Sequence, residues 1–184
     1  ALRLSREYDP KDREYFPYGL WKESTTIKLS YAELPGNSSI HPPNMCELKR
    51  LYPKKHWETR SMKQELELEV KSIDDLTLSG EYDCDLLKVD TQGSELEIIQ
   101  GAEKLLKSSV SFVLLESWTY EVHKGQALSG QIMEWMNSIG FTLIRVHEGA
   151  KWHRTPIKEI EERGLKTLVG LDLLFVRNTF DFGD

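Results

Sequence analysis

The second half of the chain alternates strand-like and helix-like patterns, and this alternation restricts the fold more than any other feature. Four short apolar segments predict strands, at residues 86–90, 110–115, 141–146 and 171–176. Amphipathic segments with the helical period lie between them, at residues 94–106 and 129–139. Strands that alternate with helices predict an α/β domain in which a mostly parallel sheet lies between helices on both faces.

The first half of the chain predicts fewer helices. Residues 25–33 and 65–70 alternate apolar and polar side chains, as half-buried strands do, and residues 14–21 could form a short strand. The polar residues 35–63, between these two alternating segments, predict a loop with one short helix near residues 45–52. A later polar stretch predicts a loop with a short helix at residues 156–163.

Length and charge limit the classes of function. The 184 residues suit a single domain spanning residues 1–184, and the formal net charge of −6 argues against a nucleic-acid partner. No apolar run approaches the roughly 18 residues of a membrane span. Cys46 and Cys84 lack the spacing of metal or redox sites, and Asp74-Asp75 has no partnering ligand at suitable spacing. We therefore expect a cytoplasmic protein with no bound metal.

The predicted helix at residues 94–106 carries two local signals. Ser94 and Glu97 have the spacing of a capping box, in which each side chain bonds a backbone N–H near the helix start. Gly101 lies inside the same segment, where glycine costs about 1 kcal/mol relative to alanine. This cost suggests that another part of the chain packs closely against Gly101.

The segment that begins this helix resembles a family signature. Residues 88–95 read Lys-Val-Asp-Thr-Gln-Gly-Ser-Glu, and Gly-Ala follows at residues 101–102. This segment is similar to the signature of the FkbM methyltransferase family, and the resemblance continues on both sides over roughly residues 15–177. It implies a Rossmann-like class I methyltransferase fold. It also implies an enzyme that moves a methyl group from S-adenosylmethionine to a hydroxyl group.

One part of the family pattern is absent from the chain. The family carries an Asp-x-Gly-Ala-Asn-x-Gly turn for the methionine part of the cofactor and a glutamate for the ribose, but no two glycines here are separated by a single residue. We therefore expect the chain to be the C-terminal portion of the fold, with its N-terminal strands missing. Its activity alone is doubtful, and an exposed strand could pair with a second copy. The sequence leaves open whether residues upstream of Ala1 supply the motif.

Two acidic residues and one histidine are the candidate catalytic residues. Asp90 and Glu116 end predicted strands, where ligands bind in open α/β sheets. Asp90 could contact the cofactor, act as the base, or only hold the turn at residues 92–94. Glu116 could be the base, accept a hydrogen bond from the substrate, or form a salt bridge to a helix. His123 suits a base because histidine titrates near neutral pH, although a lone loop histidine is more often a surface residue.

Further residues are candidates for binding. Gly19 and Leu20 lie in a segment that resembles the family's turn after its third strand, which implies contact with the cofactor, as does Gln92 beside Asp90. Glu95 could bind substrate, although the first turn of a helix favours a carboxylate in any case. Trp118 could line a substrate pocket, or it could only pack in the core.

These observations predict an S-adenosylmethionine-dependent methyltransferase that acts on a hydroxyl group of a small molecule or a sugar. The alternative is a non-catalytic α/β binding module derived from the same scaffold. A glycine-rich turn encoded upstream would favour the enzyme. The sequence does not select the acceptor, the catalytic base or the oligomeric state.

Overall fold

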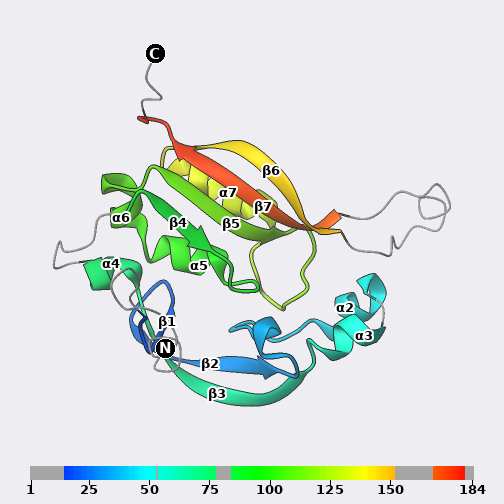
Figure 1. Cartoon of the computed structure of the whole chain (residues 1–184). Helices are drawn as coiled ribbons and strands as arrows, with labels where there is room; N and C mark the ends of the chain where they lie inside the picture. The colour runs from blue at the N-terminus through cyan, green and yellow to red at the C-terminus, as the bar shows by residue number, and fades with distance from the viewer. Residues whose placement is uncertain (1–14, 53, 78–83, 152–167, 181–184) are drawn as a thin grey trace, which may run out of the picture.

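The computed structural model describes residues 15–52, 54–77, 84–151 and 168–180, and the predicted helix at 156–163 lies outside these residues. The described residues form two separate sheets of three and four strands (Figure 1). Among them, no helix combines the length and the apolar character needed to cross a membrane.

The first sheet has the strand order β1-β3-β2. It consists of β1 (Gly19–Leu20), β2 (Thr25–Ala32) and β3 (Met62–Lys71). β2 and β3 pair antiparallel and place apolar side chains opposite each other, with Ile27 against Leu68, whereas β1 runs parallel to β3. The strand predicted at 25–33 is therefore confirmed, the one at 65–70 is longer than predicted, and the one at 14–21 is shorter.

The connection between β2 and β3 carries short helices. They are η1 (Pro35–Asn37), α2 (Met45–Leu51) and α3 (Lys54–Glu58). α2 confirms the helix predicted near 45–52. Its first turn is capped by Asn44, whose side-chain oxygen accepts a bond from the backbone N–H of Glu47.

The second sheet has the strand order β4-β5-β7-β6. Its strands are β4 (Leu86–Val89), β5 (Phe112–Trp118), β6 (Phe141–Lys151) and β7 (Leu168–Arg177). β4 and β5 pair parallel, but β7 lies between β5 and β6 and pairs antiparallel with both. The predicted Rossmann-like, mostly parallel sheet is therefore wrong. An apolar segment indicates that a strand is buried, but it does not indicate the strand's direction relative to its neighbours.

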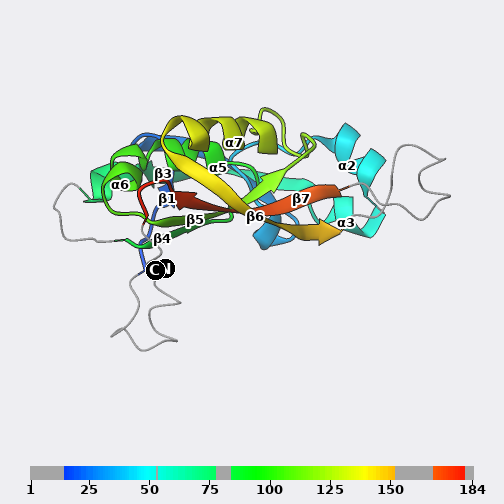
Figure 2. The same cartoon turned by 90° about the horizontal axis from the view of Figure 1, so that it is seen from above.

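The helices of this half cover one face of the second sheet, as Figure 2 shows for α5, α6 and α7. The helices are α4 (Ile73–Thr77), α5 (Glu95–Gln100), α6 (Glu103–Ser108) and α7 (Ser129–Ser138). On the covered face, Leu115 and Leu173 are fully buried, whereas Leu114 and Leu174 on the other face are only half-buried. The expected helices on both faces are thus not found in the described part of the chain.

The helix predicted at 94–106 is two helices, α5 and α6, with a break at Gly101 and Ala102. A Cβ atom on Gly101 would overlap the carbonyl oxygen of Trp21 and lie 2.9 Å from the Cα atom of Lys22. The close packing predicted at Gly101 is confirmed, since the segment after β1 passes directly over it. The capping box is wrong, because the hydroxyl of Ser94 donates instead to Thr91 Oγ1 at 3.0 Å.

Two apolar clusters form the core. The main cluster lies between α5, α6, α7 and the covered face of the second sheet, and it includes Ile99, Leu106 and Phe175. The second cluster joins α2 to the ends of β5 and β7, and consists of Leu48, Leu51, Tyr52, Trp118, Val122 and Val169. The second cluster positions the loop after β5, which contributes to the candidate site.

Candidate active site at the ends of β4 and β5

Asp90 and Glu116 lie side by side at the carboxyl ends of two parallel strands. Val89 of β4 pairs with Leu115 of β5, so the next residue of each strand is Asp90 or Glu116. Burial and the negative charges of Asp90 and Glu95 raise the pKa of Glu116 to about 8, and a hydrogen bond with Asp90 adds to this effect. With this raised pKa, Glu116 is mostly protonated at neutral pH.

An unusual backbone conformation of Gln92 directs its side chain toward Glu116. Its φ angle is 60°, in the left-handed region, which costs a residue with a side chain on the order of 1–2 kcal/mol. In this conformation Gln92 Nε2 donates to Glu116 Oε2 at 2.8 Å. A strained residue that positions a half-buried acid is typical of functional sites. The cofactor contact expected for Gln92 stays a prediction.

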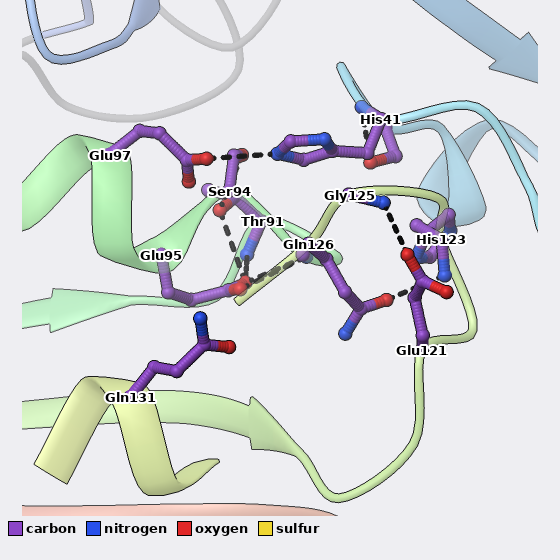
Figure 3. A network of polar contacts seen from close by, with 12 residues as sticks. His41, Thr91, Ser94, Glu95, Glu97, Glu121, His123, Gly125, Gln126 and Gln131 are labelled. Atoms are coloured by element: carbon purple, nitrogen blue, oxygen red, sulfur yellow. Dashed lines mark hydrogen bonds and ion pairs between the residues drawn. The ribbon is translucent and has the colours of Figure 1, made fainter. Parts of the chain in front are cut away.

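Glu95 anchors the turn that follows β4. Its side chain is 1% exposed and accepts hydrogen bonds from the backbone N–H groups of Thr91, at 2.9 Å, and Gly93, at 3.0 Å (Figure 3). Burial raises the pKa of Glu95, and these hydrogen bonds oppose the shift. Glu95 thus holds the turn, a role that the sequence assigned to Asp90 as one alternative. The substrate contact expected for Glu95 stays a prediction, which its burial does not favour.

His123 is buried against the same turn. It is 1% exposed, and a Cβ atom on Gly93 would lie 3.3 Å from its Nδ1 atom. Burial and the positive charge of Arg60 lower the pKa of His123 to about 4. The expectation that His123 titrates near neutral pH is therefore wrong, and so is the alternative of a surface histidine, because the loop after β5 folds inward over the second core cluster. A neutral imidazole with so low a pKa is a weak base.

Trp118 is a core residue. Its side chain is 1% exposed in the second core cluster, with the ring of His123 packed edge-on at a centroid distance of 6.4 Å. The packing alternative fits this position better than the contact with substrate, which stays a prediction.

Gly19 and Leu20 share a cavity with the turn after β4. The cavity has a volume of about 260 Å³, and β2, β3 and α5 contribute to its wall together with Ser39, Thr91 and Ser94. The sequence predicted that Gly19 and Leu20 bind the cofactor, and the structure places them beside the signature segment. The cavity is below the about 300–1,000 Å³ typical of ligand sites and has no charged lining residue, so it does not fit a whole S-adenosylmethionine molecule.

A polar contact that no sequence pattern predicted joins the two halves of the chain. The Nε2 atom of His41, in the loop before α2, lies 3.2 Å from Glu97 Oε1 (Figure 3). Burial lowers the pKa of His41, but the hydrogen bond and charge of Glu97 outweigh burial and raise it overall. The same loop bonds to the loop after β5, with Asn44 N donating to the carbonyl oxygen of Val122 at 2.9 Å. The residues around His41 contain no pattern that predicts its contact with Glu97.

Comparisons with known proteins indicate a methyltransferase family. A family model described as the methyltransferase FkbM domain matches residues 23–143. The chain is 27% identical over 149 residues to the methyltransferase sdnD of Sordaria araneosa, an alignment that covers 73% of this chain and 55% of that protein. The chain therefore spans about half the length of this curated relative. No solved structure matches the chain significantly.

Proposed function

Because the chain belongs to the FkbM methyltransferase domain family, we propose that its protein transfers a methyl group from S-adenosylmethionine to a hydroxyl group of a small molecule or a sugar. The methyltransferase named among its relatives supports the reaction class. The net charge of −6 supports a small-molecule acceptor over a nucleic acid. A cytoplasmic location and assembly with a second copy belong to the same proposal.

The pair of carboxyl groups at Asp90 and Glu116 carries this proposal. Methylation of a hydroxyl group releases its proton, and a positioned side chain speeds such a step by about 10²–10⁴-fold. Asp90 is exposed and forms an ion pair with Lys88 Nζ at 3.2 Å, so its carboxylate can accept a hydrogen bond from an acceptor hydroxyl. Gln92 donates a hydrogen bond to Glu116, the less exposed carboxyl group of the pair.

The methyl donor implied by the family carries its methyl group on a positively charged sulfur and brings its own leaving group. The chain's own residues therefore need only bind and orient the acceptor and take its proton. The cavity beside Gly19 and Leu20 could enclose part of such a donor.

The alternative function is a binding module without catalysis. It is favoured by the small size of the cavity beside Gly19 and Leu20. An enzyme must bind the methyl donor, whereas a binding module has to bind only its partner. Calorimetric titration of the full-length protein with S-adenosylhomocysteine separates the two, since binding supports the enzyme and a folded full-length protein that does not bind supports the module.

Methyl transfer itself is tested with tritiated S-adenosylmethionine and a panel of sugars, phenols and aliphatic alcohols. Asp90→Asn should lower the rate with the best acceptor by about 10²–10⁴-fold, because the amide cannot take the proton. Asp85→Asn changes an exposed residue next to the amino end of the same strand and should leave the rate unchanged. Equal rates for wild type and Asp90→Asn would refute the assignment of Asp90.

A further inference from the structure

The loop after β5, residues 119–128, lies between two other segments. On one side it forms an antiparallel bridge with the loop before α2, and Lys124 N donates to the carbonyl oxygen of Pro42 at 2.8 Å. On the other side, His123 packs on the turn after β4, because a Cβ atom on Gly93 would lie 3.3 Å from His123 Nδ1. The place of this turn, which directly follows Asp90, therefore depends on what holds the loop.

The side chain of His41 contacts both the loop after β5 and α5. Its Nε2 atom lies 3.2 Å from Glu97 Oε1 (Figure 3), and its ring also forms a hydrogen bond with the backbone of Lys124. The Nδ1 atom faces this backbone, since a Cβ atom on Gly125 would lie 3.7 Å from it. The backbone N–H of His41 donates to Ser39 Oγ at 3.1 Å, and Ser39 forms a bridge with β2. One histidine therefore joins three segments of the chain.

The contacts of the ring require its charged form. Burial lowers the pKa of His41, but the hydrogen bond and the charge of Glu97 outweigh it, and the backbone of Lys124 and the charge of Glu95 raise the pKa further. A backbone bond that favours protonated histidine is accepted by a carbonyl oxygen, so both partners of the ring are acceptors. Neutral imidazole donates from one nitrogen only, so the imidazolium alone bonds both partners. The carboxylate depends on His41 in turn, because Glu97 Oε2 is buried without a hydrogen-bond partner among the described residues.

Helix α5 provides a second connection between His41 and the turn after β4. Glu97, the partner of His41, lies two residues after Glu95 in the first turn of this helix. Glu95 accepts a hydrogen bond from the backbone N–H of Gly93 at 3.0 Å. The loop and the helix that His41 joins therefore both reach the residues that directly follow Asp90.

We propose that His41 is a positioning residue of the candidate site: its charged ring joins the loop after β5 to α5, and this junction fixes the turn that places Asp90 at the acceptor hydroxyl. His41 acts through the turn and not on the acceptor itself. The role in the reaction rests on the proposed function, whereas the junction of His41, Glu97 and the Lys124 backbone is measured without methyl transfer.

The first experiment is amide hydrogen exchange, followed by NMR at three N–H groups of the full-length protein. The N–H of Lys124 reports on the loop, that of Gly93 on the turn, and that of Asn178, which donates to the carbonyl oxygen of Gly140 at 2.9 Å, on a distant segment. In His41→Gln an uncharged amide replaces the two ring N–H groups. We expect the exchange at the loop and the turn to become about tenfold faster, while the distant group keeps its wild-type rate.

A carboxylate variant and a histidine variant complete this experiment. Glu97→Gln keeps a side chain that can hydrogen-bond to His41 but removes its charge, so exchange at the loop and the turn should again be faster than in the wild type. His147→Gln is the matched control, because His147 Nδ1 also lies near a carboxylate, 3.6 Å from Asp172 Oδ2, but on the exposed side of the sheet edge. Its exchange rates at the loop and the turn should equal those of the wild type.

The second experiment measures methyl transfer to the fastest acceptor of the panel of sugars, phenols and aliphatic alcohols. His41→Gln should lower kcat by about tenfold and change KM less, because a misplaced Asp90 impairs the reaction more than the binding of the acceptor. A residue that only stabilises the fold would leave kcat unchanged well below the unfolding temperature. His147→Gln should keep the wild-type kcat.

Each outcome has a defined meaning. Wild-type exchange at Lys124 and Gly93 in His41→Gln would overturn the junction. Faster exchange at Lys124 alone with an unchanged kcat, or an equal acceleration at Asn178, would overturn the positioning role, since His41 would then act only locally or on the whole fold. Faster exchange at both Lys124 and Gly93 in a protein without methyl transfer would keep the junction and refute the proposed function.

Discussion

Burial turns the carboxyl group of Glu116 into a weak acid, and this has a consequence for stability at the scale of a single residue. Its pKa rises from the ordinary 4.5 to about 8 in the folded protein, first because of burial and then because of Asp90 and Glu95. The folded state therefore holds this proton more tightly than the unfolded state does. Stability should fall as the pH rises from about 4.5 to about 8, by an amount on the order of a few kcal/mol.

The Glu116→Gln variant should lose this dependence, because its side chain stays neutral and can keep a hydrogen bond to Gln92. The measurement is the free energy of unfolding by urea from pH 5 to pH 9 for both proteins. His123 acts in the opposite direction, since its lowered pKa removes stability as the pH falls from 6.5 towards about 4. A parallel pH dependence for wild type and Glu116→Gln above pH 7 would contradict the assignment.

At the scale of elements, Gly101 decides where α5 ends and how β1 docks. The Trp21 carbonyl and the Lys22 backbone lie where a Cβ atom on Gly101 would be. Gly101→Ala should therefore destabilise the protein by about 1–3 kcal/mol, because neither contact can shift without moving the segment after β1. Thermal unfolding measures this effect.

Gly130 provides the matched control for this prediction. It lies in the first turn of α7, and a Cβ atom there would have nothing within 4 Å. Gly130→Ala should be neutral or stabilise the protein by up to about 1 kcal/mol, as expected for alanine in a helix. A Gly101→Ala variant as stable as Gly130→Ala would show that the approach of β1 to α5 is not tight.

At the scale of the whole molecule, the contact between His41 and Glu97 connects the loop before α2 to α5. Both side chains are largely buried, with 15% and 17% exposed. Glu97→Ala should cost about 1–3 kcal/mol, because His41 loses its partner inside the protein. Glu103→Ala removes a half-exposed surface ion pair with Lys107 and should cost less than about 0.5 kcal/mol.

The contribution of this contact should also depend on pH. The pKa of folded His41 lies above its ordinary value of 6.5, so the added stability is fully present below pH 6.5 and is lost as the pH rises through the folded pKa. The difference between wild type and Glu97→Ala should accordingly shrink from pH 6 to pH 9. Urea unfolding at the two pH values checks this, and a difference that grows with pH would contradict it.

Local patterns predicted the positions of several elements well. The alternation around Ile27 and Leu68 and the helical period of residues 129–139 are short-range signals, and the corresponding elements are found. The signature segment around Asp90 also indicated the family that the comparisons support. These features depend on a few neighbouring residues, so the sequence contains them directly.

The direction of β7, the break at Gly101 and the burial of His123 depend on contacts between distant residues. β7 pairs with β5 across a gap of more than fifty residues, and the pKa of His123 is set by the core that folds around it. Likewise, Glu116 becomes a weak acid only because tertiary packing buries it beside Asp90. The sequence by itself determined which residue types stand at the strand ends. Only the tertiary structure decided their charge and their partners, because electrostatic energies depend on burial and distance, which local patterns do not specify.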